Sequence, residues 1–174
     1  RLRSDTGGLR GDEKRRSFSW LVRTKVRLAE VVRELPRRAH DLSRRTVEES
    51  QRWRLLEAMT EVAAKRGYGD ASIADVISVA GVSRKTFYEH FSDKEDCFLT
   101  AYDVVSERLI GSLVTIGKAH EDPDERRAAQ VSAFLTAMMQ DLAAARVFMI
   151  DVLGAGPRAL ERRERINRRF AEAV

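Results

Sequence analysis

The segment from Arg84 to Phe91 combines two apolar aromatic residues with polar groups that could bind phosphates or base edges. Phe87 and Phe91 are four residues apart, so on a helix they share one face. In a DNA major groove Arg or Lys can recognise guanine, the Thr methyl can meet thymine, and Glu can accept a hydrogen bond from cytosine N4. Tyr and His can hold phosphates and so fix the register. With the phenyl rings turned inward, the remaining residues of the helix are Arg84, Lys85, Thr86, Tyr88, Glu89 and His90.

The element that must position these groups is a pair of short helices joined by a glycine turn. Ser72 and Asp75 have the spacing of an N-terminal cap. Gly81 suits a residue that leaves a helix with positive φ, and Ser83 can cap the helix that follows. The pattern predicts a helix-turn-helix over about residues 72–91. The apolar face of its first helix consists of Ile73, Val76, Ile77 and Ala80.

The joined motifs resemble the DNA-binding domain of the tetracycline-repressor (TetR) family of bacterial transcriptional regulators. A lone A-G-V-S would be a weak signal, but the whole series over about residues 48–104 is specific. The residues that carry it are Lys65-Arg66-Gly67-Tyr68, Ser72-Ile73-Ala74-Asp75-Val76, Ala80-Gly81-Val82-Ser83, Thr86-Phe87-Tyr88-Glu89-His90-Phe91 and Asp93-Lys94-Glu95.

The resemblance implies that Ser72, Tyr88, His90 and Lys94 contact phosphates, and that residues 84–86 and Glu89 face base edges or the nearby backbone. Ser72 is also a helix cap, and a surface charge is the alternative for Lys94. Glu89 departs from the neutral or aromatic residue common at this position in the family, so no operator sequence is carried over. The expected DNA-binding set is Ser72, Ser83, Arg84, Lys85, Thr86, Tyr88, Glu89, His90 and Lys94.

The rest of the chain predicts helices and no strands, so the expected fold is all-α. A helix from about Thr46, with a Thr46–Glu49 capping box, completes a three-helix DNA-binding domain. A Ser92–Glu95 box is expected to open a long helix that fades near Gly117. Further helices follow Asp122-Pro123 and Gly156-Pro157. The expected buried stripe of the first of these helices is Leu55, Leu56, Met59, Val62 and Ala63.

Charge and family resemblance divide the chain into three parts. Residues 1–45 hold 14 Lys/Arg and 6 Asp/Glu, whereas the remainder has a net charge of −3. This extension is expected to be partly disordered, with a possible amphipathic helix at residues 14–35, and both a nucleic-acid-binding arm and a solvated tail fit its composition. Residues 46–93 are the expected DNA-binding domain. Residues 94–174 are expected to form a helical regulatory domain that is incomplete at its C-terminus, because family members usually continue with two more long helices.

In the family, such a regulatory domain binds an effector and forms a homodimer. Few charges among the aromatic and methionine side chains would suit a small apolar or aromatic effector. At helical spacing the same residues also read as ordinary core. The candidate pocket residues are Phe98, Tyr102, Phe134, Met138, Phe148 and Met149. The implied protein is a cytoplasmic, ligand-responsive repressor that binds double-stranded DNA as a homodimer on a palindromic operator.

Other functional classes find little support in the sequence. The three histidines lack metal-ligand spacing, no nucleotide-binding or nucleophile motif occurs, and no cofactor or membrane span is expected. The single cysteine, Cys97, lies in an apolar helical pattern and reads as a small buried hydrophobe. The alternative to a DNA-binding regulator is a helical interaction adaptor that keeps the helix-turn-helix fold without binding DNA. An enzyme is not expected.

Overall fold

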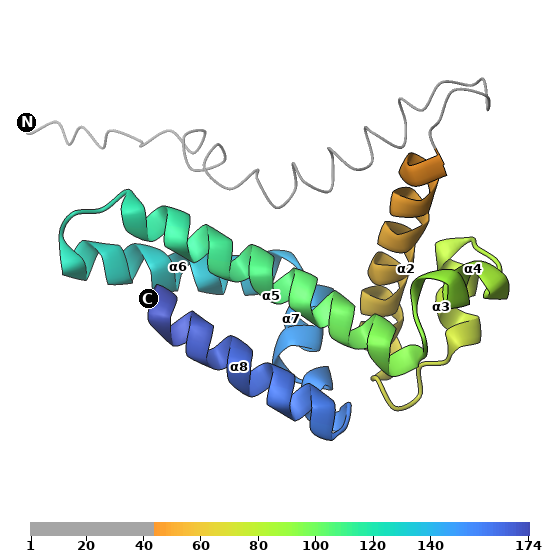
Figure 1. Ribbon diagram of the computed structural model, residues 1–174. Helices are drawn as coiled ribbons and strands as arrows, with labels where there is room; N and C mark the ends of the chain where they lie inside the picture. Colours follow the sequence, from red (N-terminus) through yellow and green to blue (C-terminus); the bar gives the residue numbers. More distant parts are fainter. Residues whose placement is uncertain (1–43) are drawn as a thin grey trace, which may run out of the picture. The chain divides into compact units, whose positions relative to one another are not determined.

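The computed structural model describes residues 44–174, and within this range every regular element is a helix. This confirms the all-α prediction; the expectations for residues 1–43, including a helix at 14–35, lie outside the described residues. In Figure 1 the long helix α5 lies beside α6, α7 and α8 and also contacts α2. The elements are α2 (Arg44–Arg66), α3 (Ile73–Ala80), α4 (Arg84–His90), α5 (Lys94–Lys118), α6 (Pro123–Gln140), α7 (Leu142–Met149), the 3₁₀ helix η1 (Asp151–Gly154) and α8 (Pro157–Ala173).

The helix-turn-helix prediction is confirmed, because α3 and α4 are separated by residues 81–83 and both pack on α2. α2 ends at Arg66, and Gly67 follows with φ +83°. Gly81 ends α3 in the left-handed conformation, at φ +63°. Side chains larger than glycine are strained there, which explains glycine at the corner. The predicted stripe of α2, from Leu55 to Ala63, is buried.

Two predicted helix caps are wrong. Thr46 lies inside α2, which begins at Arg44, and Glu49 accepts a hydrogen bond from Arg45. Arginine is a good helix former, so the helix continues upstream of the threonine. At α5 the cap is Asp93 rather than Ser92: Asp93 accepts from the backbone N–H of Asp96 at 2.8 Å. Aspartate caps as well as serine does, so the cap lies one residue later than predicted.

The core forms around α5. Phe98, Tyr102 and Leu113 have no exposed surface, and the Tyr102 ring stacks on Phe148 of α7 with 5.9 Å between centroids. Cys97 is also fully buried, and burial raises the pKa of its thiol to about 12. The thiol is therefore protonated at neutral pH and acts as a small hydrophobe, as predicted.

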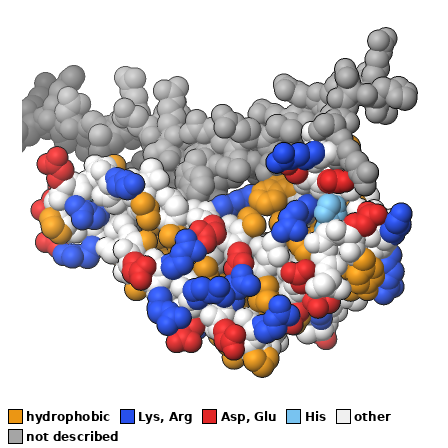
Figure 2. All heavy atoms as spheres, viewed as in Figure 1, with side chains coloured by type: hydrophobic (Ala, Val, Ile, Leu, Met, Phe, Trp, Pro, Cys, Tyr) orange, Lys and Arg blue, Asp and Glu red, His pale blue; other side chains and the backbone are white. Residues whose placement is uncertain are grey.

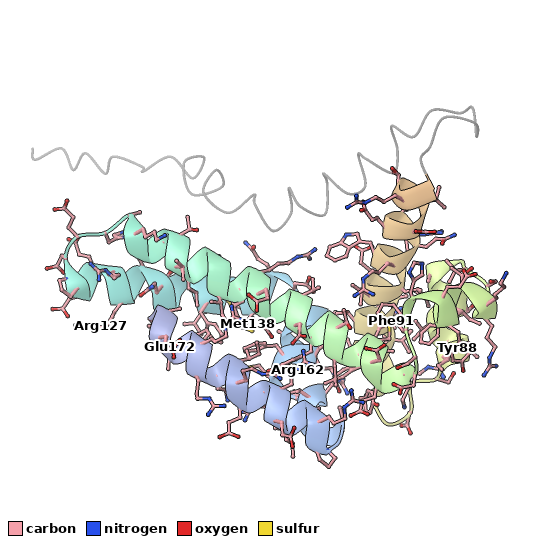
Figure 3. All side chains as sticks on the ribbon, viewed as in Figure 1. Tyr88, Phe91, Arg127, Met138, Arg162 and Glu172 are labelled. Carbon is pink, nitrogen blue, oxygen red and sulfur yellow. The ribbon has the colours of Figure 1, made fainter. Side chains whose placement is uncertain are left out.

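A ladder of ion pairs joins α5 to α8. Arg158 pairs with Glu95, Arg162 with Asp103, and Arg169 with Glu107. Figure 2 shows acidic and basic side chains interleaved on this side of the molecule, and Figure 3 shows Arg162 on α8 beside α5. Exposed pairs each contribute at most about 1 kcal/mol, so the ladder fixes the alignment of two helices that apolar contacts hold together.

The two glycines of α5 predict opposite effects of the same substitution. A Cβ at Gly111 would meet no atom within 4 Å, so Gly111→Ala should raise the free energy of unfolding by roughly 0.5–1 kcal/mol. A Cβ at Gly117 would lie 2.7 Å from Nε2 of Gln130. That buried amide donates to the carbonyls of Leu113 and Ala173, and its displacement would cost about 1 kcal/mol for each bond lost. Gly117→Ala should therefore destabilise. Urea unfolding of both variants measures the difference, and equal stabilisation would contradict the packing around Gln130.

A buried carboxyl at the start of η1 predicts an unusual dependence of stability on pH. Asp151 is 6% exposed, and its Oδ2 lies 3.6 Å from Nε of Arg146. Burial raises the pKa of Asp151, against the opposing effects of Arg146 and the Tyr68 backbone. A raised folded-state pKa stabilises the fold at low pH, and this contribution is lost as pH rises through the folded pKa. Asp151→Asn should therefore gain stability relative to the natural protein as the pH rises above about 4.

Asp122 provides the matched control with the opposite sign. The backbone N–H groups of Glu125 and Asp124 lower the pKa of this exposed cap. Its contribution is present above the unfolded-state pKa and lost as the pH falls through the folded-state pKa. Asp122→Asn should therefore lose stability relative to the natural protein as the pH rises towards about 4, and the difference should stay constant above that pH. Urea titrations at several pH values measure both differences. Parallel curves for Asp151→Asn and the natural protein would show that the buried carboxyl carries no penalty.

Candidate nucleic-acid interface

The start of α3 is fixed by the predicted capping box. The Ser72 hydroxyl donates to Asp75 Oδ2 at 2.6 Å, and the Asp75 backbone N–H donates to the Ser72 hydroxyl at 3.2 Å. The Ser72 hydroxyl and backbone N–H lower the pKa of Asp75, with a smaller effect from Arg66. The carboxylate is therefore ionised at neutral pH. The Ser72 hydroxyl already serves as a cap, so its phosphate contact remains a prediction.

The turn and its cap set where α4 projects. The backbone N–H groups of Gly81 and Val82 both bond to the carbonyl of Ile77. Ser83 then accepts the backbone N–H of Thr86 at 3.0 Å, and the two hydroxyls lie 2.9 Å apart. The predicted cap is confirmed, and it holds the Thr86 hydroxyl close to the helix start. The Thr86 methyl group remains the part suited to an apolar base contact.

Two phenyl rings anchor α4 and leave its other side in solvent. Phe87 is fully buried and Phe91 is 2% exposed, with 5.8 Å between their centroids. In Figure 3 Phe91 lies beside α2, whereas Tyr88 lies farther from α2. The anchors confirm the predicted orientation. The side chains on the solvent side are Arg84, Lys85, Tyr88 and Glu89.

The charges on this outer side are only weakly engaged with one another. Lys85 Nζ lies 3.7 Å from Glu89 Oε1, and the two side chains are 87% and 54% exposed. Such a helix pair contributes about 0.3–0.5 kcal/mol, so a base edge can displace it. A carboxylate near DNA phosphates would repel them, and the nearby Lys85 ammonium offsets the charge of Glu89. The Arg84 guanidinium lies 5.9 Å from the centre of the Tyr88 ring, near the limit of a cation–π contact.

His90 differs from the other outward residues. It is half-buried, its Nε2 has no hydrogen-bond partner among the described residues, and it lines a groove between α2 and α4. Arg52 of α2 donates to the His90 carbonyl at 3.4 Å and stacks on the Phe91 ring at 4.8 Å. The sequence analysis missed Arg52, because no local pattern links α2 to the end of α4. His90 remains a predicted phosphate contact.

This arrangement can place a short helix in a DNA major groove. The described part of the chain after residue 45 carries a net negative charge, so attraction to phosphates must come from local groups such as Arg84 and Lys85. Figure 2 shows basic side chains at the edge formed by α3 and α4. Within residues 44–174, no cluster of three or more His, Cys, Asp or Glu could hold a metal, and no helix is long and apolar enough to span a bilayer.

Residues 55–101 match the family model described as bacterial regulatory proteins, tetR family. The match covers α3, α4, the turn between them and the flanking parts of α2 and α5. Residues 55–101 belong to the tetR family. This confirms the resemblance read from the sequence.

Named relatives and solved structures agree with the TetR assignment. The HTH-type transcriptional activator FasR of Mycolicibacterium smegmatis is 30% identical over 93 residues, which are 53% of this chain and 42% of FasR. The HTH-type transcriptional regulator AcrR of Shigella flexneri is 32% identical over 74 residues, 41% of this chain and 34% of AcrR. The chain therefore spans less than half the length of either relative.

The fold is similar to that of the transcriptional regulator FadR from Bacillus subtilis, solved in complex with stearoyl-CoA. The TM-score is 0.65 at 20% identity, covering 70% of this chain and 66% of that chain. The similarity in fold covers more of the chain than residues 55–101. At this identity the likeness establishes the fold alone.

The residues predicted to line an effector pocket make ring contacts with several different partners. Phe98 packs on Tyr68, and Tyr102 stacks on Phe148. Phe134 meets Phe170 of α8 edge-on, with 5.4 Å between centroids. Tyr102 has a buried hydroxyl without a hydrogen-bond partner among the described residues. Of the six residues it is therefore the best candidate for a polar contact with an effector. Met138 is half-buried beside Phe134, whereas Met149 is 48% exposed. The pocket remains a prediction.

Proposed function

We propose that this TetR-family chain is a sequence-specific, double-stranded DNA-binding transcriptional regulator that reads a major groove with α4. The observation that carries the proposal is the division of α4 into a buried phenyl face and an exposed polar face held by a capped glycine turn. Phe87 and Phe91 keep the helix in place, so Arg84, Lys85 and Glu89 are free to meet base edges. Residues 46–93 form the reading part, and residues 94–174 form the regulatory part.

Selection from random duplexes tests this function directly. The purified chain is incubated with random double-stranded oligonucleotides, and the retained fragments are sequenced. Enrichment of one motif supports sequence-specific reading, and an inverted repeat supports binding by two copies. Retention without enrichment, or no retention at low salt, would contradict the proposal and favour the adaptor alternative.

We further propose that the chain acts as a homodimer controlled by a small apolar or aromatic effector. An exposed apolar row that a second copy could cover runs along α6 to the first residue of α7: Val131, Leu135 and Met139 on α6, and Leu142 on α7. In such a dimer the α4 helices of the two copies, held about 34–36 Å apart, would match successive major grooves. An effector that prefers another spacing lowers DNA affinity only by its differential affinity for the two states. Sedimentation velocity with and without the selected duplex tests the oligomer.

The effector class is supported by the buried aromatic residues of α5 and α7. The Tyr102–Phe148 stack lies between α5, which directly follows the proposed reading part, and α7, which also packs on α2. The stearoyl-CoA bound to the FadR structure makes long-chain acyl compounds the first probes for this chain. Thermal-shift screening with acyl chains, aromatic compounds and polar metabolites tests the class, and stabilisation by highly charged molecules alone would contradict it. Repression is the proposed outcome, and in vitro transcription from the selected site distinguishes it from activation.

A further inference from the structure

Lys94, predicted from the sequence to contact a phosphate, directs its side chain towards the protein itself. It is the first residue of α5, and its ammonium reaches back to the turn between α2 and α3. Nζ donates to the carbonyl oxygens of Tyr68 at 3.0 Å, Gly69 at 3.3 Å and Ala71 at 3.0 Å. The turn between α2 and α3 is therefore tied to the start of α5 by one side chain.

These contacts use the full donor capacity of the group. A lysine ammonium has three N–H donors and no acceptor, and here three carbonyls take them. The ring of Tyr68 also lies 4.3 Å from Nζ. A phosphate could bind this ammonium only by displacing charge-assisted bonds that are already made. Lys85 presents the opposite case, because its side chain is 87% exposed and its ammonium lies 3.7 Å from Glu89 Oε1, beyond hydrogen-bond distance.

The turn that Lys94 holds determines where α3 begins. Ala71 is 3% exposed, and the next residue, Ser72, is the N-cap of α3. One helical turn along α5 from Lys94, Phe98 packs on Tyr68 with 4.6 Å between ring centroids. Lys94 and Phe98 thus hold the same turn through its carbonyls and its aromatic ring. Loosening this contact would change the position of α3, on which α4 packs.

We propose that Lys94 is a positioning residue for DNA binding: it fixes the turn at residues 68–71 against α5 and does not itself contact phosphate. The inference rests on the proposed DNA-binding function. It connects α5 mechanically to α3 and α4, because a movement of the N-terminal end of α5 would also move residues 68–71, whose carbonyl groups are bonded to Lys94.

The salt dependence of binding separates a positioning role from a phosphate contact. Each lost phosphate contact lowers the slope of log affinity against log salt by about 0.9. The probe is a 30-base-pair duplex of arbitrary sequence, titrated with the full chain at increasing KCl concentrations, so no operator is needed. Lys94→Met should weaken binding at every salt concentration without changing the slope. Arg84→Met should lower the slope, and Lys118→Met, at the other end of α5, controls for the loss of one charge.

Amide hydrogen exchange provides a readout that does not depend on DNA. Loss of the ammonium should speed exchange at residues 67–75 roughly tenfold or more in Lys94→Met, since hydrogen bonds to charged groups are involved. Lys118→Met and Arg84→Met should leave this segment unchanged. Lys94→Arg should not restore protection, because a planar guanidinium cannot direct three donors at the same three carbonyls. A phosphate contact, by contrast, would tolerate arginine.

The outcomes separate this inference from the proposed function. A slope lowered by about 0.9 in Lys94→Met, with unchanged exchange, would show a phosphate contact and overturn the inference. Unchanged affinity and unchanged exchange would overturn it as well. If the natural chain binds no duplex at low salt, the proposed function fails and takes the DNA-binding part of the inference with it. Exchange then still decides whether Lys94 holds the turn.

Discussion

Replacing Phe87 with alanine is expected to lower the free energy of unfolding by about 3–5 kcal/mol and to abolish DNA binding. Phe87 has no exposed surface and lies 5.8 Å from Phe91, so its removal leaves a cavity beneath α4. α4 has only seven residues and cannot remain helical without tertiary contacts. Urea unfolding measures the stability, and fluorescence anisotropy with the selected duplex measures the binding.

Tyr88 provides the matched control from the neighbouring position. Its ring is 48% exposed and meets Phe87 edge-on. Tyr88→Ala removes a comparable ring from the solvent side, so it should cost well under half the stability lost in Phe87→Ala. Binding to all duplexes should nevertheless weaken, with a salt slope lower by about 0.9 if the hydroxyl contacts a phosphate. Equal losses of stability in the two variants would contradict the buried and exposed assignments of these rings.

Local patterns predicted the elements of the DNA-binding part because the forces that define them act over a few residues. Phe87 and Phe91 lie one helical turn apart, Gly81 needs a left-handed backbone, and Ser83 caps the helix that follows. Each of these features can be read from a window shorter than ten residues. The errors at Thr46 and Ser92 are shifts of helix starts, where neighbouring residues cap or extend a helix equally well.

Contacts between distant segments could not be predicted in this way. Lys94 bonds to carbonyls 23 to 26 residues earlier, and Arg52 reaches the carbonyl of His90. Every residue has a backbone carbonyl, so the sequence does not show which carbonyl oxygens will accept hydrogen bonds from a distant lysine or arginine. The same holds for the proposed regulatory part: helical spacing pointed to six aromatic and methionine residues but could not show which ring packs on which.

Substituting a residue of α4 that faces the bases should change which base pair is preferred, rather than the affinity for all DNA sequences alike. Glu89→Gln is expected to shift preference at one base pair by about 1–3 kcal/mol, because a carboxylate accepts from cytosine N4 whereas glutamine pairs with adenine. The substitution also releases Lys85 from its 3.7 Å ion pair, so affinity for every duplex should rise slightly. The informative quantity is therefore the relative enrichment of bases, measured by repeating the random-duplex selection with the variant.

The control for this prediction is Glu61→Gln. Glu61 is another partly exposed glutamate, paired with a lysine four residues along its helix, but it lies on α2, away from the reading helix. Loss of one negative charge is thus the same in both variants, and only the position differs. Glu61→Gln should leave the selected motif unchanged. If Glu89→Gln also leaves it unchanged, or alters every position equally, Glu89 does not face a base, and α4 lies in the groove at a different rotation from the one that its buried phenyl rings imply.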